Sequence, residues 1–242
     1  MSKRRFTSII WRAALLLLFL GIAAGSFFWL SQSGAFAIKE IDLEGNRVTG
    51  TEEIMDRAAP LLRGQSLLKP SFSDAESVVA SLPYIEGVEV ERDFPDRVRI
   101  LVREYRPFLC LNAAAGKVLL LSADGKALAA LERADPAYPV LTTREPCEVD
   151  VGGKAACPDV LTGISFLANV PVNFNQEFAA VTVAGGDISA QTRSNVNVRF
   201  GSLEEYGMKF EVLRQLIARS AGAGAQLTID ISVPDRPVTK QG

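Results

Sequence analysis

The alternation of apolar and polar positions between residues 38 and 107 predicts a small mixed domain. Three runs alternate apolar with charged residues, as half-buried strands do, at 41–43, 88–90 and 98–102. Between the first two runs, one set of apolar residues has the spacing of a helical face: Ala75, Val78, Val79 and Leu82. With another helix around Ile54, the predicted order is strand, helix, helix, strand, strand.

Three capping boxes mark expected helix starts, at 49–52, 73–76 and 202–205. In each, a Ser or Thr side chain would accept a hydrogen bond from a backbone N–H, and the Glu three residues later would reach back to the first residue. Pro60 with Gly64 is expected to close the first helix and Pro83 the second, because proline lacks the N–H that a continuing helix needs.

The pattern continues from 107 to 233. Short strands are predicted at 108–112, 118–121, 178–183, 188–191, 196–200 and 227–233, with a helix at 160–168 and a loop at 144–158. The third capping box opens a helix with the apolar stripe Leu203, Tyr206, Phe210, Leu213 and Ile217. The fold class is therefore α+β, with a first domain at 36–105, a mostly antiparallel β-domain with helices at 107–233, and a C-terminal tail at 234–242.

An uncharged apolar run at 13–30, AALLLLFLGIAAGSFFWL, predicts a single transmembrane helix. Its eighteen residues give about 27 Å of helix, close to the hydrocarbon thickness of a bilayer. Lys3, Arg4, Arg5 and Arg12 precede it, so residues 1–12 should stay in the cytoplasm and residues 31–242 should lie outside. The alternative is a cleaved signal peptide, for which Ala35-Phe36-Ala37 offers a cleavage pattern.

Charge and composition exclude several classes of function. The formal charge is −2, and the first twelve residues carry +4, so the remainder is near −6 and offers no footprint for nucleic acid. The chain has no histidine, which excludes Ser-His-Asp and Cys-His catalysis. It also has no phosphate-binding glycine loop. We therefore expect no catalytic residue, cofactor or small-molecule substrate; only a carboxylate-pair hydrolase stays open.

Three cysteines suit an exported chain, where disulfides can form. Cys147 and Cys157 bracket the loop EVDVGGKAA and can close a small ring, although the sequence leaves open whether they are bridged. Cys110 lies among apolar residues and is expected to pack in a core. No metal site is expected, because the thiols are far apart and histidine is absent.

Several fragments, taken in order, resemble the FtsQ family of bacterial cell-division proteins (DivIB in Gram-positives), whose first outer module is a POTRA domain. They are Ile41-x-Leu43-x-Gly45-Asn46, Leu82-Pro83-Tyr84-Ile85, Val90 to Pro95 and Val102 to Pro107. This chain departs from the family pattern by Tyr84 in place of Trp and by an additional Tyr105. The likeness resumes at Val198 to Gly201 with Lys209, and again at 227–233, where Ser232 replaces the usual Arg.

The resemblance implies a non-enzymatic bitopic scaffold of the divisome, in the cytoplasmic membrane and enriched at the division site. Its partners would be FtsB- and FtsL-type bitopic proteins and other division components, and its role would be to support septum assembly. In the family the partner docks on the last strand, which matches Leu227, Thr228, Ile229, Asp230, Ile231, Ser232 and Val233. Strand addition to an exposed sheet edge is the expected mechanism.

A second candidate surface is the outer face of the first domain near Arg97, Arg99 and Arg103, which otherwise forms a solvated face opposite Glu89 and Glu91. Two other function classes remain open at this point. One is an exported POTRA-containing assembly factor, and the other is the membrane-tethered carboxylate hydrolase.

Overall fold

The computed structural model describes residues 15–22, 25, 34, 36–69, 71–174, 177–220 and 227–241. The chain divides into two compact units, Met1–Glu104 and Tyr105–Gly242, and each is described by itself.

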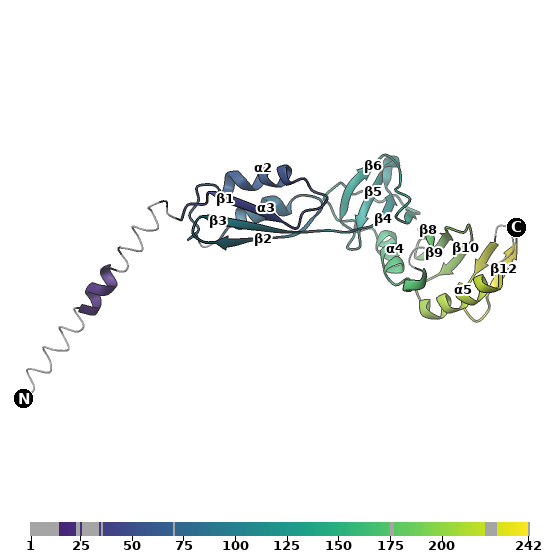
Figure 1. The fold of residues 1–242 in the computed structure, drawn as a ribbon. Coiled ribbons are helices and arrows are strands. Elements are labelled where there is room, and N and C mark those ends of the chain that lie inside the picture. Colours follow the sequence, from purple (N-terminus) through teal and green to yellow (C-terminus); the bar gives the residue numbers. More distant parts are fainter. Residues whose placement is uncertain are drawn as a thin grey trace, which may run out of the picture. The chain divides into compact units, whose positions relative to one another are not determined.

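Residues 15–22 form a helical segment whose large apolar side chains are exposed (Figure 1). Within the described ranges, no helix combines the length and apolarity that crossing a bilayer requires. Most of the predicted 13–30 span and all of the 1–12 tail lie outside the described residues. The membrane helix therefore stays a prediction.

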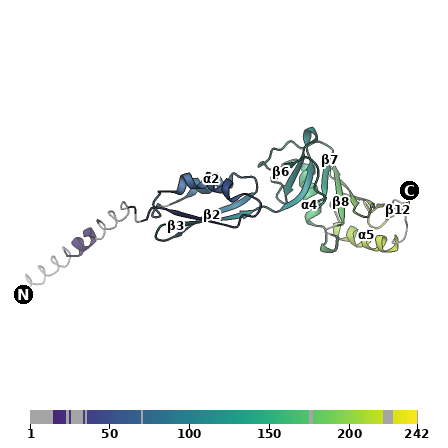
Figure 2. The same ribbon diagram turned by 45° about the horizontal axis from the view of Figure 1, so that its top comes forward.

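The first unit has the predicted order of elements. They are β1 (Glu40–Glu44), α2 (Thr51–Leu62), α3 (Ser73–Ala80), β2 (Ile85–Asp93) and β3 (Arg97–Glu104). The strands form one sheet in the order β1-β3-β2, with β1 parallel and β2 antiparallel to β3 (Figure 1). Both helices cover one face of this sheet (Figure 2).

The core of the first unit lies between the helices and the central strand. Val98, Ile100 and Val102 alternate along β3 and are buried against apolar helix residues such as Ile54 and Val79. The intervening side chains of β3 point to the opposite face, as the period of two requires. The sheet therefore has one apolar face and one charged face.

The capping predictions were wrong for all three helices. α2 is capped by Gly50 and α3 by Phe72, neither through a side chain, and α5 starts at Tyr206. Tertiary contacts replace the local ones: the N–H of Thr49 donates to Glu104, and the carbonyl of Ser202 accepts from Lys209 Nζ. The local pattern was correct about where helices occur but not about what holds their ends.

The helix end predicted at Pro60 and Gly64 was confirmed, because α2 runs two residues past the proline to Leu62 and Gly64 follows at φ +76. A proline so close to the helix end removes a single hydrogen bond. Burial of Ala58 and Leu62 in the core favours keeping that last turn helical.

The second unit contains nine strands and two long helices. They are β4 (Pro107–Asn112), β5 (Val118–Ser122), β6 (Ala127–Leu131), β7 (Val140–Thr143), α4 (Pro158–Ala168), β8 (Phe178–Ala184), β9 (Asp187–Thr192), β10 (Asn197–Gly201), α5 (Tyr206–Ser220), β11 (Leu227–Asp230) and β12 (Val238–Gln241). Short 3-10 turns occupy Ala114–Gly116 and Val172–Phe174.

All nine strands belong to one sheet in the order β12-β11-β10-β9-β8-β7-β4-β5-β6. Pairing is antiparallel toward both ends, but β4, β7 and β8 run parallel, as do β10 and β11. The sheet is thus mixed rather than uniformly antiparallel. Its two outer strands are β6 and β12.

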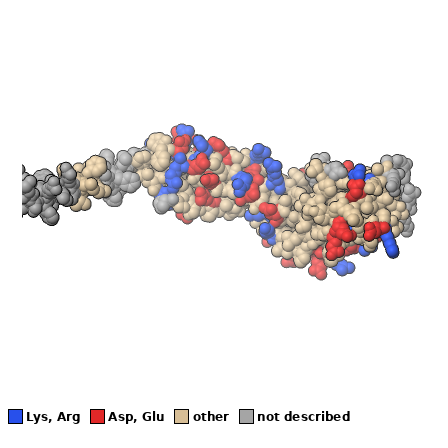
Figure 3. Space-filling model, turned by 90° about the horizontal axis from the view of Figure 1, so that it is seen from below, with Lys and Arg blue, Asp and Glu red and all other residues tan. Residues whose placement is uncertain are grey.

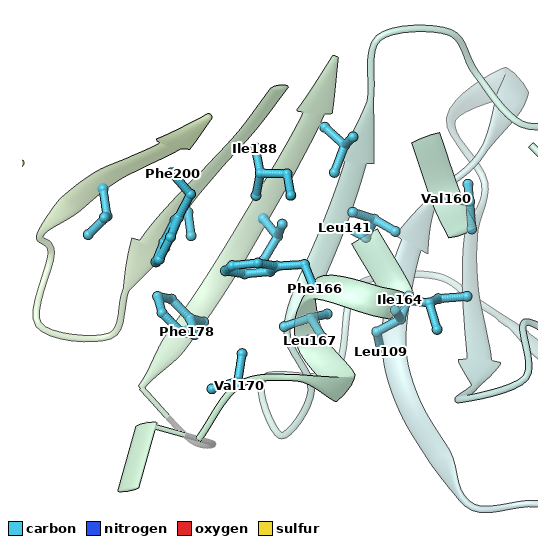
Figure 4. Packing of buried hydrophobic residues seen from close by; sticks show 14 of the residues in the cluster. Leu109, Leu141, Val160, Ile164, Phe166, Leu167, Val170, Phe178, Ile188 and Phe200 are labelled. Atoms are coloured by element: carbon cyan, nitrogen blue, oxygen red, sulfur yellow. The ribbon is translucent and has the colours of Figure 1, made fainter. Parts of the chain in front are cut away.

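An aromatic cluster joins α4 and α5 to one face of this sheet, and Figure 4 shows the part formed by Phe166, Phe178 and Phe200. Phe166 of α4 contacts Phe200 with 4.8 Å between ring centroids, and Phe210 of α5 contacts the same ring at 5.2 Å. α4 can approach closely because Gly163 lies over Leu141, where a Cβ would come within 2.5 Å of a methyl carbon. The opposite face of β8 to β11 is left to polar side chains.

Two strands of the second unit were not predicted, β7 and β12, whereas the Asp124-Gly125 pair indicates a hairpin turn, and the structure contains the β5–β6 hairpin. β12 lies in the segment predicted as a C-terminal tail, 234–242. Its four residues, VTKQ, are too short to give a clear period, and the turn Pro234-Asp235-Arg236-Pro237 before it was the available signal.

Candidate partner-binding site

The strand predicted to carry the partner is not at the edge of the sheet. β11 pairs with β10 on one side and with β12 on the other. It ends at Asp230, and the chain turns between Val233 and Arg236 before β12 begins. The free edge of the sheet is therefore β12, one strand beyond the predicted position.

Backbone directions identify the groups that this edge offers. Ile231 donates its N–H to the carbonyl of Arg199, so Ile229 and Ile231 point their backbone groups toward β10. Alternate residues of a strand point the opposite way, so Thr228 and Asp230 face β12. Their antiparallel partners in β12 are Lys240 and Val238.

The remaining β12 residues, Thr239 and Gln241, therefore direct their backbone N–H and C=O groups away from the sheet. Among the described residues, none supplies a hydrogen bond to these outward groups. A row of unpaired backbone donors and acceptors is a template for pairing with another strand.

Asp230 organises the end of β11. Its carboxylate accepts hydrogen bonds from the backbone N–H of Ser232 at 3.0 Å and from the Ser232 hydroxyl at 2.7 Å. Arg199 bridges it to Asp187, at 3.5 Å and 3.1 Å respectively. Burial raises the pKa of the Asp230 carboxyl, but the hydrogen bonds from Ser232 and the charge of Arg199 outweigh it, so that pKa lies below its usual value.

The residues predicted as the interface divide between two faces. Leu227, Ile229 and Ile231 are buried in the core and cannot meet a partner directly. Thr228 faces outward and lines a shallow hollow of about 300 Å³ on the outer face of the sheet. The hollow is otherwise lined by Ala180, Thr182, Ser189, Ala190, Gln191, Asn197, Val198 and Arg199.

Two apolar side chains are exposed where β11 turns into β12. Val233 is 56% exposed and Val238 is 62% exposed. Both flank the turn, next to the open edge. They are available to apolar side chains of a strand laid along β12.

The opposite edge of the same sheet is covered. The N–H of Ala127 in β6 donates to Gly153, and its carbonyl accepts from Gly152. These glycines belong to the loop closed by the Cys147–Cys157 disulfide, which the structure contains and the sequence left open. Cys110 is free and buried, and burial raises the pKa of its thiol.

The arginines of the first unit lie on the outer face of its sheet, where acidic and basic groups are interspersed (Figure 3). Arg97 pairs with Glu40 and Asp42, and Arg99 pairs with Glu44 at 3.1 Å. Arg103 meets Glu86 at 2.9 Å and is 73% exposed. These charges are largely neutralised within the domain, which weakens the case for this face as a docking surface.

Glu104, at the end of β3, belongs to the Val102–Pro107 fragment of the family pattern and has a structural role. Glu104 accepts hydrogen bonds from three consecutive backbone N–H groups, those of Arg47, Val48 and Thr49, at 2.8 to 3.0 Å. Burial raises the pKa of its carboxyl, but these bonds prevail and hold it below the usual value. Gly45, at φ +96, lets the same loop pass over the Val102 carbonyl, where a Cβ would come within 2.1 Å.

Within the described ranges, no group of three or more His, Cys, Asp or Glu side chains is arranged to hold a metal ion. Among its described lining residues, the hollow beside β10 contains one cation, Arg199, which is paired with two carboxylates.

Comparison with known proteins agrees with this geometry. Residues 36–105 match the family model of the FtsQ-type POTRA domain. The cell division protein FtsQ of Streptomyces collinus is 27% identical over an alignment covering 98% of this chain and 89% of that protein. The chain is thus similar to FtsQ proteins along most of its length, and the relatives that it matches carry the name of a cell division protein.

Other FtsQ proteins match over different extents. That of Streptomyces griseus is 25% identical, covering 83% of this chain and 95% of the relative. That of Neisseria meningitidis is 27% identical, covering 55% of each chain. The match therefore spans about half the length of the Neisseria FtsQ.

Proposed function

We propose that this chain is a bitopic scaffold of the cell-division machinery that binds other division proteins on the outer side of the cytoplasmic membrane. In this role it supports septum assembly without catalysing a reaction. The observation that carries the proposal is the open β12 edge in a chain that is similar to FtsQ proteins.

Docking would occur by strand addition. An extended partner segment would pair with the outward backbone groups of Thr239 and Gln241 and extend the nine-stranded sheet. Four residues of β12 offer about 13 Å of edge, so side-chain contacts must add to the backbone bonds. Exposed Val233 and Val238 favour a partner segment with apolar residues at matching positions.

The segment 227–233 would support the docking strand from behind rather than meet the partner. Asp230 fixes the turn that leads into β12 through its bonds to Ser232 and Arg199. The side chains of Ile229 and Ile231 are buried and attach the same segment to the core by packing. A partner of FtsB or FtsL type, itself bitopic, would present its outer segment to this edge.

The membrane part of the proposal rests on the uncharged run at 13–30 and the basic residues before it. A single span would place residues 1–12 in the cytoplasm and both folded units outside. The reducing cytoplasm rarely sustains a disulfide, so the Cys147–Cys157 bridge favours the same topology.

The function is tested by imaging and depletion in dividing cells. A fluorescent fusion to the full chain should form midcell bands, and depletion of the chain should give filaments because septa fail. Uniform envelope signal together with normal division after depletion would overturn the proposal.

A further inference from the structure

Three segments of the first unit meet where the chain enters it from the N-terminal side. They are 36–39, 63–69 and 92–96, which we call the entry end. Leu67 donates its N–H to the carbonyl of Phe36 at 2.8 Å, and Lys39 donates its N–H to the carbonyl of Asp96 at 2.8 Å. The Arg92 guanidinium ties the second segment to the third by donating to the carbonyls of Leu67 and Lys69.

An aromatic side chain projects into solvent at this end. Phe94, at the tip of the β2–β3 hairpin, is 55% exposed although it packs edge-on against Phe36 with ring centroids 6.0 Å apart. The neighbouring Leu68 is only half-buried. The apolar surface of this hairpin tip is therefore not buried in the core of the unit.

Basic groups are concentrated around this aromatic pair. The range 36–105 carries nine Lys and Arg against fourteen Asp and Glu, which gives a net charge of −5. Four of the nine basic residues lie on the entry-end segments: Lys39, Arg63, Lys69 and Arg92. Asp93 and Asp96 lie on the same segments, and Lys39 is paired with Asp96 at 3.0 Å, so the entry end has a net charge of +2 in an otherwise acidic domain.

Chain length keeps the entry end near the proposed anchor. The apolar run ends at Leu30, six residues before Phe36. Six residues span at most about 21 Å when fully extended. The first folded residues therefore stay within a short distance of the lipid headgroups whenever the run spans the membrane.

We propose that the entry end rests on the outer membrane surface, with Phe94 at the headgroup boundary and the surrounding basic groups on anionic lipids. Exposed aromatic residues with a basic surround are the side chains that hold protein surfaces in this zone. The inference rests on the proposed membrane anchor. It would fix the direction in which β3 leads away from the membrane, toward the Glu104 end of the domain.

Single-tryptophan variants of the full chain test the contact. In a chain with Trp11→Phe and Trp29→Phe, one variant carries Phe94→Trp and a matched control carries Val48→Trp. Val48 is 59% exposed and lies in the loop held by Glu104, at the opposite end of β3. Each is reconstituted in phosphatidylglycerol vesicles whose acyl chains are brominated near the headgroup, and quenching of the tryptophan fluorescence is measured.

We expect quenching at position 94 to be at least twofold stronger than at position 48. A third variant with Trp11→Phe alone keeps Trp29, which reports on the anchor. Quenched Trp29 with equal quenching at positions 94 and 48 would overturn the inference and leave the anchor standing. Unquenched Trp29 would instead overturn the anchor, and the inference with it.

A charge variant tests the lipid chemistry. Arg63→Glu with Lys69→Glu should reduce the quenching at position 94 in phosphatidylglycerol vesicles, as should replacing that lipid by phosphatidylcholine. Arg47→Glu, an exposed residue at the opposite end, should leave the quenching unchanged. Equal quenching in all these cases would overturn the role of the anionic lipid.

Discussion

The sheets of the two units differ in how their outer strands are covered. In the first unit, Glu76 of α3 accepts the backbone N–H of Val90 at 3.1 Å and so occupies a donor on the outer side of β2. The other outer strand, β1, is five residues long. Its acidic residues Glu40, Asp42 and Glu44 alternate with apolar ones. Short, charged or side-chain-capped edges resist pairing with another chain.

The sheet of the second unit is covered at one end only. The disulfide-closed loop pairs with β6, whereas β12 offers Thr239 and Gln241 outward. Among the described residues, three outer strands thus have charged side chains or a covered backbone group, and the outward groups of β12 have no partner. The two sheets therefore differ in the backbone groups that they leave available for pairing with another strand.

The largest expected effect comes from removing the cover of β6. Replacing both bridged cysteines, Cys147→Ser with Cys157→Ser, releases a loop closed over ten positions and should lower the free energy of unfolding of the second unit by about 2–3 kcal/mol. The freed β6 should also allow concentration-dependent self-association, measured by sedimentation. Cys110→Ala removes an unbridged thiol and should not cause association, and a monomeric double variant would contradict the covering role of the loop.

Next in size is the loss of the Glu104 contacts in the first unit. Glu104→Gln should cost about 1–3 kcal/mol at pH 7, because the carboxylate accepts three backbone bonds. Amide exchange of residues 47–49 measures the effect locally.

The Glu104 effect should depend on pH in one direction. A carboxyl whose pKa is lowered by folding stabilises the protein above its unfolded pKa, about 4.3, and loses this contribution as pH falls through the lower folded pKa. The wild type and Glu104→Gln should therefore converge in acid. A difference between them that stays constant from pH 7 to acid would contradict the charge-based explanation.

Opening the β2 edge should have a smaller effect. Glu76→Ala removes the carboxylate from the Val90 N–H and should cost about 1 kcal/mol, measured by denaturant unfolding. Asp74→Ala is the matched control, because it lies in the same first helical turn and no described hydrogen bond joins its side chain to β2. Equal losses in both variants would mean that the helix terminus, and not the edge, accounts for the effect.

The smallest effect is expected on the charged face of the first unit. Arg103→Ala breaks an exposed pair with Glu86 and should change stability by less than about 0.5 kcal/mol. Partner binding should also be unchanged, as measured by pull-down of the division partner. A tenfold loss of binding would instead establish this face as a second docking surface.

The sequence predicted elements whose side chains follow a period over enough residues. The alternating core residues of β3 and the apolar stripe of α5 around Phe210 and Leu213 are examples. The capping box predicted for α2 was wrong because Glu104, more than fifty residues along the chain, accepts the N–H of Thr49 in place of a local side chain. Such a contact leaves no trace in a local pattern.

The open edge at β12 was not predicted, for a related reason. β12 is four residues long, and β11 before it has the stronger strand pattern. A sheet edge is a property of topology: only the pairing of Asp230 with Val238 reveals that another strand follows. The match of 227–233 to the last family strand therefore led to the strand behind the edge.

The central claim is that the outward backbone of β12 recruits a division partner, and proline at position 239 tests it most directly. Thr239→Pro removes an outward N–H and leaves the bonds between β11 and β12 in place, whereas Thr239→Ala keeps the N–H and removes only the side chain.

The measurement is the affinity of the purified chain for the outer segment of an FtsB-type partner, with amide exchange showing that the second unit stays folded. We predict that Thr239→Pro binds at least tenfold more weakly than the wild type, and that Thr239→Ala binds within about twofold of it, which is under about 0.5 kcal/mol. Wild-type affinity in a folded Thr239→Pro chain would contradict the account.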